Sequence, residues 1–437
     1  MSKFAHKIKN KLNSIIEYMS QNVDKFTKAP KSDFTRKRKL PFSTTVKIVL
    51  SMGGNSISSE LLEYFDYSVD TATASAFVRQ RNKISSAALP FLFRKFTDSA
   101  DTLKTYRGYR LLAADGSTIN ICTDPNDSEI YLQNKPNRTG FNQLHLNVLY
   151  DLHNKLYTDA VIQPKRKMNE TRALTDIIDE SSYSQNTMII ADRGYESYNV
   201  FAHIEQKGYK YAIRVKDVNS SNSMLKSLPL PETNEFDVEI CINLTRKQTN
   251  EVKANPAFYK IIYPSNVFDY LELKSKAIYP MTFRVVRFAI DDGKYETIIT
   301  NLDKSEFAPP DIKKLYQMRW GVETSFRELK YSIGLSHLHA KKREFSEQEI
   351  FARMIMYNFC EMIISQVIIT QKSTKHIYQV NFTMAVQVCK LLFRHRGKSP
   401  PDAEGLIQKY ILPVRENRIY VRNIAMKPFV YFTYRVA

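Results

Sequence analysis

A helical repeat of apolar residues runs through residues 311–333 of this chain. At a step of about 100° per residue, six apolar side chains fall on one side of the helix, the side expected to face a core. Pro309 and Pro310 suit the first helical turn, and Gly334 suits a left-handed cap at its end. The six apolar positions are Leu315, Met318, Val322, Phe326, Leu329 and Ile333.

A second stripe of polar residues lies beside this apolar face. Tyr316, Arg319, Glu323 and Lys330 fall within roughly 60° of one another on the same helix. An acid flanked by two cations suits a site that binds both a metal ion and a phosphate group. The alternative is an ordinary amphipathic helix whose charged residues are solvated, since such charge pairs are common on exposed helix faces.

Before this helix, strand-like and helix-like patterns alternate along the chain. The order of the elements is β-β-β-α-β-α-β, which predicts an α/β fold with a mixed sheet and helices on its faces. The stretch that follows, before the 311–333 helix, is rich in strands and predicts a β-rich insertion. The expected core strands are 109–114, 144–150, 156–162, 187–191 and 210–215, the helices are 169–181 and 197–207, and the insertion strands are 236–243, 258–263, 281–290 and 295–302.

The start of the chain is strongly basic. Residues 1–47 contain twelve Lys or Arg against three Asp or Glu, which predicts a basic arm that grips phosphates. Three short helices with tight turns follow, and their spacing favours a small helix-turn-helix-like DNA reader. These helices are expected at 43–52, 57–66 and 70–84, with Phe77 and Ile84 facing inward and Arg79, Arg81 and Lys83 facing out.

Composition supports a globular protein that binds a polyanion. The chain has 437 residues, 43% of them hydrophobic, and a formal net charge of +19, so nucleic acid is the expected partner. The most apolar stretch, 354–370, is interrupted by polar residues, which argues against a membrane span. The four cysteines are scattered without a Cys-x-x-Cys pair, which favours a reducing cytoplasm and argues against a zinc site.

Two aspartates follow apolar strands in similar positions. Asp115 comes after strand 109–114 and Asp192 after strand 187–191, each just before a turn that contains glycine. Ligands gather outside the carboxyl ends of strands in open α/β sheets, so both acids are expected to meet Glu323 there. Three carboxylates repel one another unless a cation lies between them, and hard oxygen ligands suit Mg²⁺ or Mn²⁺. Two such ions promote phosphoryl displacement.

These motifs resemble a known family. The order of elements is similar to a ribonuclease H-like fold, and the three acids resemble the DDE triad of transposases. Residues 316–330 match the Tyr-x2-Arg-x3-Glu-x6-Lys signature of the bacterial insertion sequence four family at every spacing. The phrases Asp115-Gly116-Ser117-Thr118 and Asp192-Arg193-Gly194-Tyr195 resemble the surroundings of that family's two aspartates.

The resemblance implies a role for each matching residue. Asp115, Asp192 and Glu323 would hold two Mg²⁺ (or Mn²⁺) ions. Tyr316, Arg319 and Lys330 would contact phosphates of the element's terminal DNA, and Arg193 would be a further phosphate contact. Trp320 would stack on a displaced base, or alternatively pack in the core.

The resemblance also implies the reaction and the partners. A DNA transposase would cleave at the ends of an insertion sequence and transfer the strand in a cut-and-paste reaction through a hairpin. Its partners would be double-stranded DNA, at terminal inverted repeats and target, and a second copy of the chain in a synaptic homodimer. It would act on the nucleoid in the bacterial cytoplasm. Two alternatives share much of the pattern: a ribonuclease H-like DNA nuclease without strand transfer, and a non-catalytic DNA-binding derivative of a transposase.

The same reasoning divides the chain into five regions. They are a helical DNA-binding region at 1–100, the first part of the catalytic core at 101–215, the β-rich insertion at 216–305, the last part of the core at 306–345, and a C-terminal helical region at 346–437.

Overall fold

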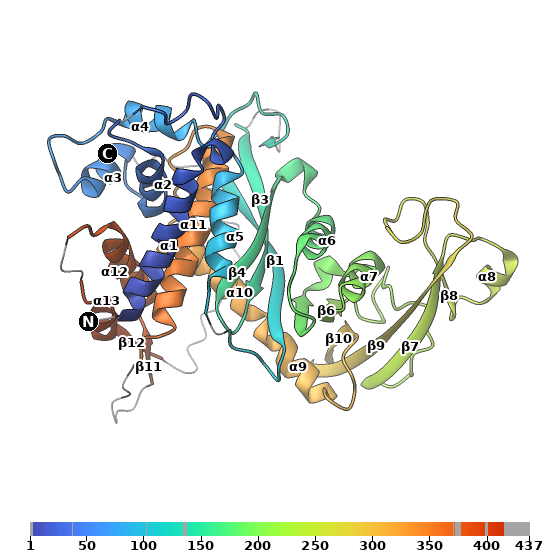
Figure 1. Cartoon of the computed structure of the whole chain (residues 1–437). Coiled ribbons are helices and arrows are strands. Elements are labelled where there is room, and N and C mark those ends of the chain that lie inside the picture. The colour runs from blue at the N-terminus through green and yellow to red at the C-terminus, as the bar shows by residue number, and fades with distance from the viewer. Residues whose placement is uncertain are drawn as a thin grey trace.

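The structure, a computed structural model, describes residues 3–414 apart from 37, 102, 134–136, 138, 370, 372–376 and 398–400. The described residues form a large mixed sheet with helices packed on its faces (Figure 1). The α-helices are α1 Lys3–Gln21, α2 Phe42–Ser51, α3 Ile57–Tyr64, α4 Ala74–Arg81, α5 Ala88–Asp98, α6 Glu170–Glu180, α7 Tyr198–Gln206, α8 Asn250–Ala254, α9 Pro309–Met318, α10 Trp320–Glu328, α11 Arg343–Ile364, α12 Phe382–Arg394 and α13 Ala403–Lys409. Short 3-10 turns are η1 Val23–Phe26, η2 Lys165–Lys167 and η3 Arg193–Tyr195, and η4 Leu329–Ile333 is a π-turn.

The strands are β1 Arg110–Ile121, β2 Tyr131–Leu132, β3 Phe141–Asp151, β4 Leu156–Pro164, β5 Thr187–Ala191, β6 Lys210–Val215, β7 Phe236–Thr245, β8 Tyr259–Ile261, β9 Ile278–Asp291, β10 Lys294–Thr300, β11 Tyr378–Val380 and β12 Ile411–Pro413. In the large sheet the order is β2-β3-β1-β5-β6-β10-β9-β7-β8, and β4 pairs with β3. β1, β3 and β4 pair antiparallel, whereas β1, β5 and β6 pair parallel. The α/β class with a mixed sheet is therefore confirmed.

The strand-rich stretch between β6 and α9 continues this sheet. β10 pairs antiparallel with β6, and β9 and β7 follow outward from it. In Figure 1 these strands and the short helix α8 extend away from the helical part of the molecule. β9 and β7 are thus connected to β6 in one sheet through β10.

Helices cover the two faces of the sheet. On one face, α6 and α7 bury Ile178 and Phe201 against Ile189 of β5. On the other face, α9 buries Leu315 against Ile190 of β5 and the neighbouring strands. Alternate residues of β5 therefore pack against the helices on opposite faces of the sheet, as the two-residue period of a strand requires.

The N-terminal helices share one core with α11. The 22-residue helix α11 lies beside α1, α2 and α5 and is buried along most of its length. The predicted basic arm is wrong for residues 3–21, because they form helix α1. Its apolar residues recur every three or four positions and face the core, while lysines fill the positions between them. The buried residues of α1 are Ala5, Ile8, Leu12, Ile16 and Met19.

The three predicted N-terminal helices are present as α2, α3 and α4, and one predicted orientation is wrong. Phe77 and Ile84 are buried and Arg79 is exposed, as expected. Arg81, expected to face out, is only 2% exposed and donates to Glu349 of α11 at 2.7 Å. A buried carboxylate on a distant helix can hold an arginine inside the core, and local spacing does not reveal it.

The helix predicted at 311–333 is present in three consecutive pieces, α9, α10 and η4. Leu315, Val322 and Leu329 are fully buried, which confirms the apolar face, whereas Met318 is half-buried. Gly334 ends the segment with a φ of 100°, the left-handed conformation expected of it.

β1 is longer than predicted and does not end before Asp115. It continues to Ile121 because β3 pairs with it antiparallel along this whole stretch. The parallel pairing with β5, however, stops at Ala114, which lies opposite Ala191. A turn-forming Asp-Gly pair therefore lies within a strand, at the point where one of its two neighbouring strands ends.

The described C-terminal part contains α12 and α13, whose Leu392 and Ile407 join the core around α11. Residues 415–437 of the predicted C-terminal region lie outside the described residues. No helix in the described part of the chain has the length and apolar character that crossing a bilayer requires.

Glu361 on α11 is a buried carboxyl group that should make stability depend on pH. Burial raises its pKa from an ordinary 4.5 to about 8, and Glu328 adds to the shift. Because the folded-state pKa is raised, its contribution to stability is present below pH 4.5 and is lost as the pH rises through 8. We expect the free energy of unfolding of Glu361→Gln, relative to that of the wild type, to increase as the pH is raised from 5.5 to 8.5. The increase should be on the order of 1 kcal/mol per pH unit. Urea unfolding at both pH values measures this, and an equal difference at both would contradict it.

Candidate active site

The first two predicted acids lie side by side because of the strand pairing. Ala114 and Ala191 are the last paired residues of the parallel strands β1 and β5, and Asp115 and Asp192 follow them directly. Neighbouring strands lie about 4.8 Å apart, so the backbones of the two aspartates are close. Asp115 Oδ1 accepts from the N–H of Gly116 and Asp192 Oδ1 accepts from the N–H of Gly194, each at 2.8 Å.

Helix α10 brings the third acid, Glu323, to the same place. Val322 and Phe326 of this helix are buried in the core with residues of β1, β3 and β4. Ser325 shares a buried hydrogen bond of 2.9 Å with the Tyr157 hydroxyl of β4. These contacts fix the helix against the sheet, and Glu323 lies on its less buried side.

Arg319 links two of the three acids. Its guanidinium donates to Glu323 Oε1 at 2.7 Å and lies 3.9 Å from Asp115 Oδ2. The arginine is 6% exposed, so the surrounding protein screens its charge less than water would. It is the cation that partly balances the acidic group in this structure.

The three acids affect one another's charge. Burial raises the pKa of Asp115 to about 6, the N–H of Gly116 and Arg319 oppose the shift, and the charges of Asp192 and Glu323 add to it. The negative form of Asp115 is thus disfavoured mainly because the carboxyl group is buried, and further because two other carboxylates lie near it. Arg319 alone does not offset these two effects.

The residues fit a divalent cation in their chemistry. All three offer carboxylate oxygens, the ligands that Mg²⁺ and Mn²⁺ prefer, and their mutual repulsion is what such an ion relieves. Within the described residues, though, no three Asp, Glu, His or Cys side chains converge as a ready set of ligands. Glu323 is engaged by Arg319, so ligation would require the carboxylate to exchange that hydrogen bond for the ion.

The remaining predicted residues differ in how accessible they are. Tyr316 is 3% exposed and has the Arg319 guanidinium 5.7 Å from its ring centre. Lys330 is half-buried, and burial lowers its pKa while Asp115 nearby opposes this. Trp320 is 58% exposed, which rules out the core-packed alternative, and Arg193 is exposed.

The prediction from sequence missed two residues at this site, Glu170 and His145. Glu170 is the first residue of α6, and its Oε1 lies 2.8 Å from Nε2 of His145 on β3. A Cβ added to Gly116 would lie 2.8 Å from Glu170 Oε1, and one added to Gly194 would lie 3.3 Å from Glu170 Oε2. The glycines after the two aspartates were the available signal, but they suggested turns and not a close neighbour.

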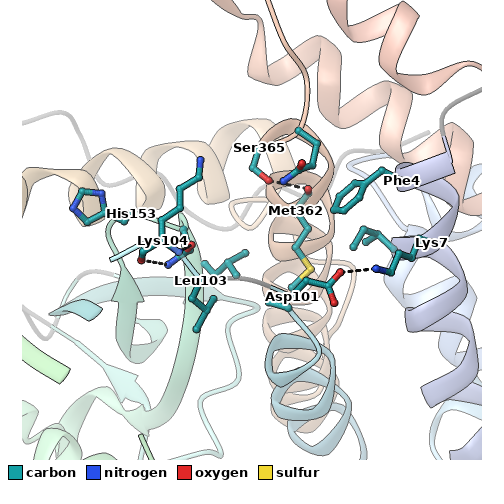
Figure 2. Close-up of a pocket in the computed structure, with 13 residues that line it drawn as sticks. Phe4, Lys7, Asp101, Leu103, Lys104, His153, Met362 and Ser365 are labelled. Atoms are coloured by element: carbon teal, nitrogen blue, oxygen red, sulfur yellow. Dashed lines mark hydrogen bonds and ion pairs between the residues drawn. The ribbon is translucent and has the colours of Figure 1, made fainter. Parts of the chain in front are cut away.

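Figure 2 shows a separate cavity of about 680 Å³ between α1, the end of α11 and the turn after β3. Phe4, Lys7 and His153 are among its lining residues, and Lys7 pairs with Asp101 at 2.9 Å. Asp115, Asp192 and Glu323 are not among the residues that line it. This cavity is therefore distinct from the acidic site.

Two aspartates that follow neighbouring strands thus lie close to a glutamate on a packed helix, and comparison with known proteins gives the family. The chain belongs to the family described as the transposase DDE domain, whose model matches residues 106–359, more than half of the chain. The resemblance to DDE transposases is thus confirmed.

Two individual proteins are similar to the chain. The transposase InsG for insertion sequence element IS4, from Escherichia coli (strain K12), is 28% identical over 154 residues. That match covers 32% of this chain and 34% of the relative, so it spans about a third of that protein's length. A cryo-EM structure of a piggyBac transposase synaptic complex with hairpin DNA aligns with a TM-score of 0.41 and 11% identity, covering 90% of this chain and 78% of that chain.

The close approach to Gly116 leads to a prediction about stability. We expect Gly116→Ala to destabilise the fold by about 1–3 kcal/mol, because its Cβ would lie 2.4 Å from His145 Nε2 and displace the histidine from Glu170. Gly194→Ala is the milder comparison, with nearest contacts of 3.0 and 3.3 Å. Urea unfolding of both variants measures the difference. A Gly116→Ala protein as stable as the wild type would contradict the packing described.

Proposed function

We propose that this protein is a DNA transposase that cleaves phosphodiester bonds at the ends of a bacterial insertion sequence and joins the freed end to target DNA. The observation that carries the proposal is the placement of Asp115 and Asp192 after the last residue pair of β1 and β5, with Arg319 linking Asp115 to Glu323. Membership of the DDE transposase family supports this assignment of the three acids.

We further propose that the core is ribonuclease H-like and carries an insertion. The strand order β4-β3-β1-β5-β6, with the first three antiparallel and the last three parallel, supports this. The segment between β6 and α9 would then be the β-rich insertion, since it adds strands beyond β6 before the helix that bears Glu323. Residues 101–215 and 306–345 would form the catalytic core around it.

Asp115, Asp192 and Glu323 would hold two Mg²⁺ (or Mn²⁺) ions. When bound, such ions activate the attacking oxygen and stabilise the leaving oxygen of an in-line displacement at phosphorus. The chain's own contribution is to keep the carboxylates ionised and close together. Arg319 serves that purpose, because its charge favours the ionised form of Asp115.

The basic and aromatic residues around the acids would bind the DNA. Lys330 lies near enough to Asp115 for the two charges to interact, so it would contact a phosphate beside the reacting one. Trp320 and Arg193 are exposed and available, the first to stack on an unpaired base and the second to contact a phosphate. Tyr316 and Arg319 are buried, so their contact with phosphate would follow a rearrangement around Glu323.

The wider reaction follows from the family assignment. The substrate would be double-stranded DNA at terminal inverted repeats, cut in a cut-and-paste reaction through a hairpin, with two copies of the chain bringing the ends together. A net charge of +19 favours binding to DNA of any sequence before the ends are recognised. The protein would act in the bacterial cytoplasm, on the nucleoid.

The proposal is tested with labelled duplex DNA carrying the inverted repeats that flank the gene. We expect Mg²⁺-dependent nicking at the repeat, and joining of a pre-cut end to target DNA. Glu323→Gln should lower the rate of both reactions by at least about a hundredfold, because it removes one charged ligand from the ions. Gel analysis of the products measures cutting and joining separately.

The matched control is Glu347→Gln on α11, which changes a partly exposed glutamate away from the three acids. It should retain both reactions. Cutting without joining would favour the nuclease alternative. Binding of the repeat without either reaction in the wild-type protein would favour a non-catalytic derivative. Metal-dependent cleavage that survives Glu323→Gln would show that the acid is wrongly assigned.

A further inference from the structure

Asp115 and the residue after it face opposite sides of the sheet. Leu111 of β1 packs with α9, whereas Leu112 and Ala114 pack with α6 and α7. Side chains alternate along a strand, so Asp115 points to the side of α9 and α10, and position 116 points to the side of α6. The space behind the first aspartate is therefore the space in front of α6.

Glu170 and His145 fill that space. His145 is 3% exposed, and its Nε2 would lie only 2.4 Å from a Cβ on Gly116. The same nitrogen makes the 2.8 Å hydrogen bond to Glu170, and this bond holds the pKa of Glu170 below its usual range. The hydrogen-bonded pair therefore fills the space beside Gly116 of β1, and moving either side chain away would break that bond.

Glu170 also reaches the turn that follows the second aspartate. Its other oxygen, Oε2, would lie 3.3 Å from a Cβ on Gly194, whose N–H donates to Asp192. Tyr195 lies in the same group, since the charges of Glu170, Asp115 and Asp192 all raise its pKa in addition to burial. The two oxygens of one carboxylate therefore lie next to the positions that Cβ atoms on Gly116 and Gly194 would take.

We propose that Glu170, held by His145, is a positioning residue that sets the separation of Asp115 and Asp192 by supporting Gly116 and Gly194 from behind the sheet. This inference rests on the proposed function, because it concerns the same site. It gives a reason for the glycine after Asp115, because a Cβ at position 116 would overlap His145 and Glu170, while a Cβ at position 194 would only be tight against Glu170.

The geometry favours support over direct ligation of an ion. Oε1 of Glu170 is occupied by His145, and the two oxygens lie next to the positions that Cβ atoms on Gly116 and Gly194 would take. By the alternation of side chains along β1, Asp115 points to the other side of the sheet. Groups that orient a metal ligand without touching the ion typically alter metal affinity by about 10-fold to 100-fold when removed.

The test separates the reach of the side chain from its charge. Glu170→Asp keeps the charge but withdraws the carboxylate from the two glycines. Glu170→Gln keeps the length and an oxygen that accepts from His145. Mn²⁺ binding to the full chain, followed by the electron paramagnetic resonance of free Mn²⁺, reports the site without any reaction. We expect Glu170→Asp to weaken Mn²⁺ binding about tenfold and Glu170→Gln to change it less than about threefold.

The matched control is Asp179→Ala, at the other end of α6. It removes a similar carboxylate–histidine hydrogen bond, 2.7 Å from Asp179 Oδ1 to His203 Nδ1, away from the site. It should leave Mn²⁺ binding unchanged. Thermal unfolding of each variant is measured alongside, because a purely structural role would lower the melting temperature while leaving Mn²⁺ affinity intact.

The outcomes distinguish failure of the positioning role of Glu170 from failure of the proposed metal site. Unchanged Mn²⁺ affinity in Glu170→Asp, while Asp115→Asn loses binding, overturns the positioning role and leaves the metal site standing. Equal loss in Glu170→Gln and Glu170→Asp also overturns it, because a side chain of full length that still accepts from His145 would then fail to support the site. If the wild-type chain binds no Mn²⁺, or Asp115→Asn binds as well as wild type, the metal site itself is wrong and the positioning role falls with it.

Discussion

The burial of Asp115 close to two further carboxylates is the constraint that the structure around this site has to meet. Asp115, Asp192 and Glu323 come from two strands and a helix that are far apart in the chain. Burial raises the pKa of Asp115 to about 6, the charges of Asp192 and Glu323 add to this, and Arg319 is a neighbouring cation that opposes it. Left to themselves, such groups would move apart or become protonated. The surrounding fold must therefore supply the rigidity that holds them together.

That rigidity comes from backbone hydrogen bonds and a continuous apolar core, and not from the acids themselves. β1 is paired on both sides up to Ala114, and α10 is fixed by Val322, Phe326 and the bond between Ser325 and Tyr157. Groups mounted on paired strands and packed helices keep their separation better than groups on loops. The unfavourable electrostatics of the site are in this way offset by packing elsewhere.

Much of the fold could be read from the sequence, because its signals are local. β5 and β6 have the bounds that their apolar runs predict, and the α9–α10 segment shows the expected buried face and left-handed Gly334. What the sequence could not reveal depends on distant partners. The extension of β1 past Asp115 requires β3, and the burial of Arg81 requires Glu349.

The site shows the same division between local and distant information. The three acids could be proposed from their spacing and from the strands that precede them. The pair of Glu170 and His145 could not, because one lies at the start of a helix and the other in a strand, and neither carries a motif. Only the folded chain shows that these two side chains take up the space at Gly116. A glycine beside an acid thus carries two meanings, a turn or a close neighbour, and only the three-dimensional packing separates them.

The buried ion pair between Arg81 and Glu349 bears on how the N-terminal helices could serve DNA binding. Arg81 lies on α4 and Glu349 on α11, and the same carboxylate group accepts from the backbone N–H of His339 at 2.8 Å. Breaking such a pair leaves an unpaired charge in the core, which costs several kcal/mol. α4 is therefore not free to reorient against α11, as a DNA-binding domain on a flexible linker would be. Any DNA held by α2, α3 and α4 would keep a fixed relation to the helix that packs beside α10. The N-terminal helices and the helix that bears Glu323 are packed on one continuous core.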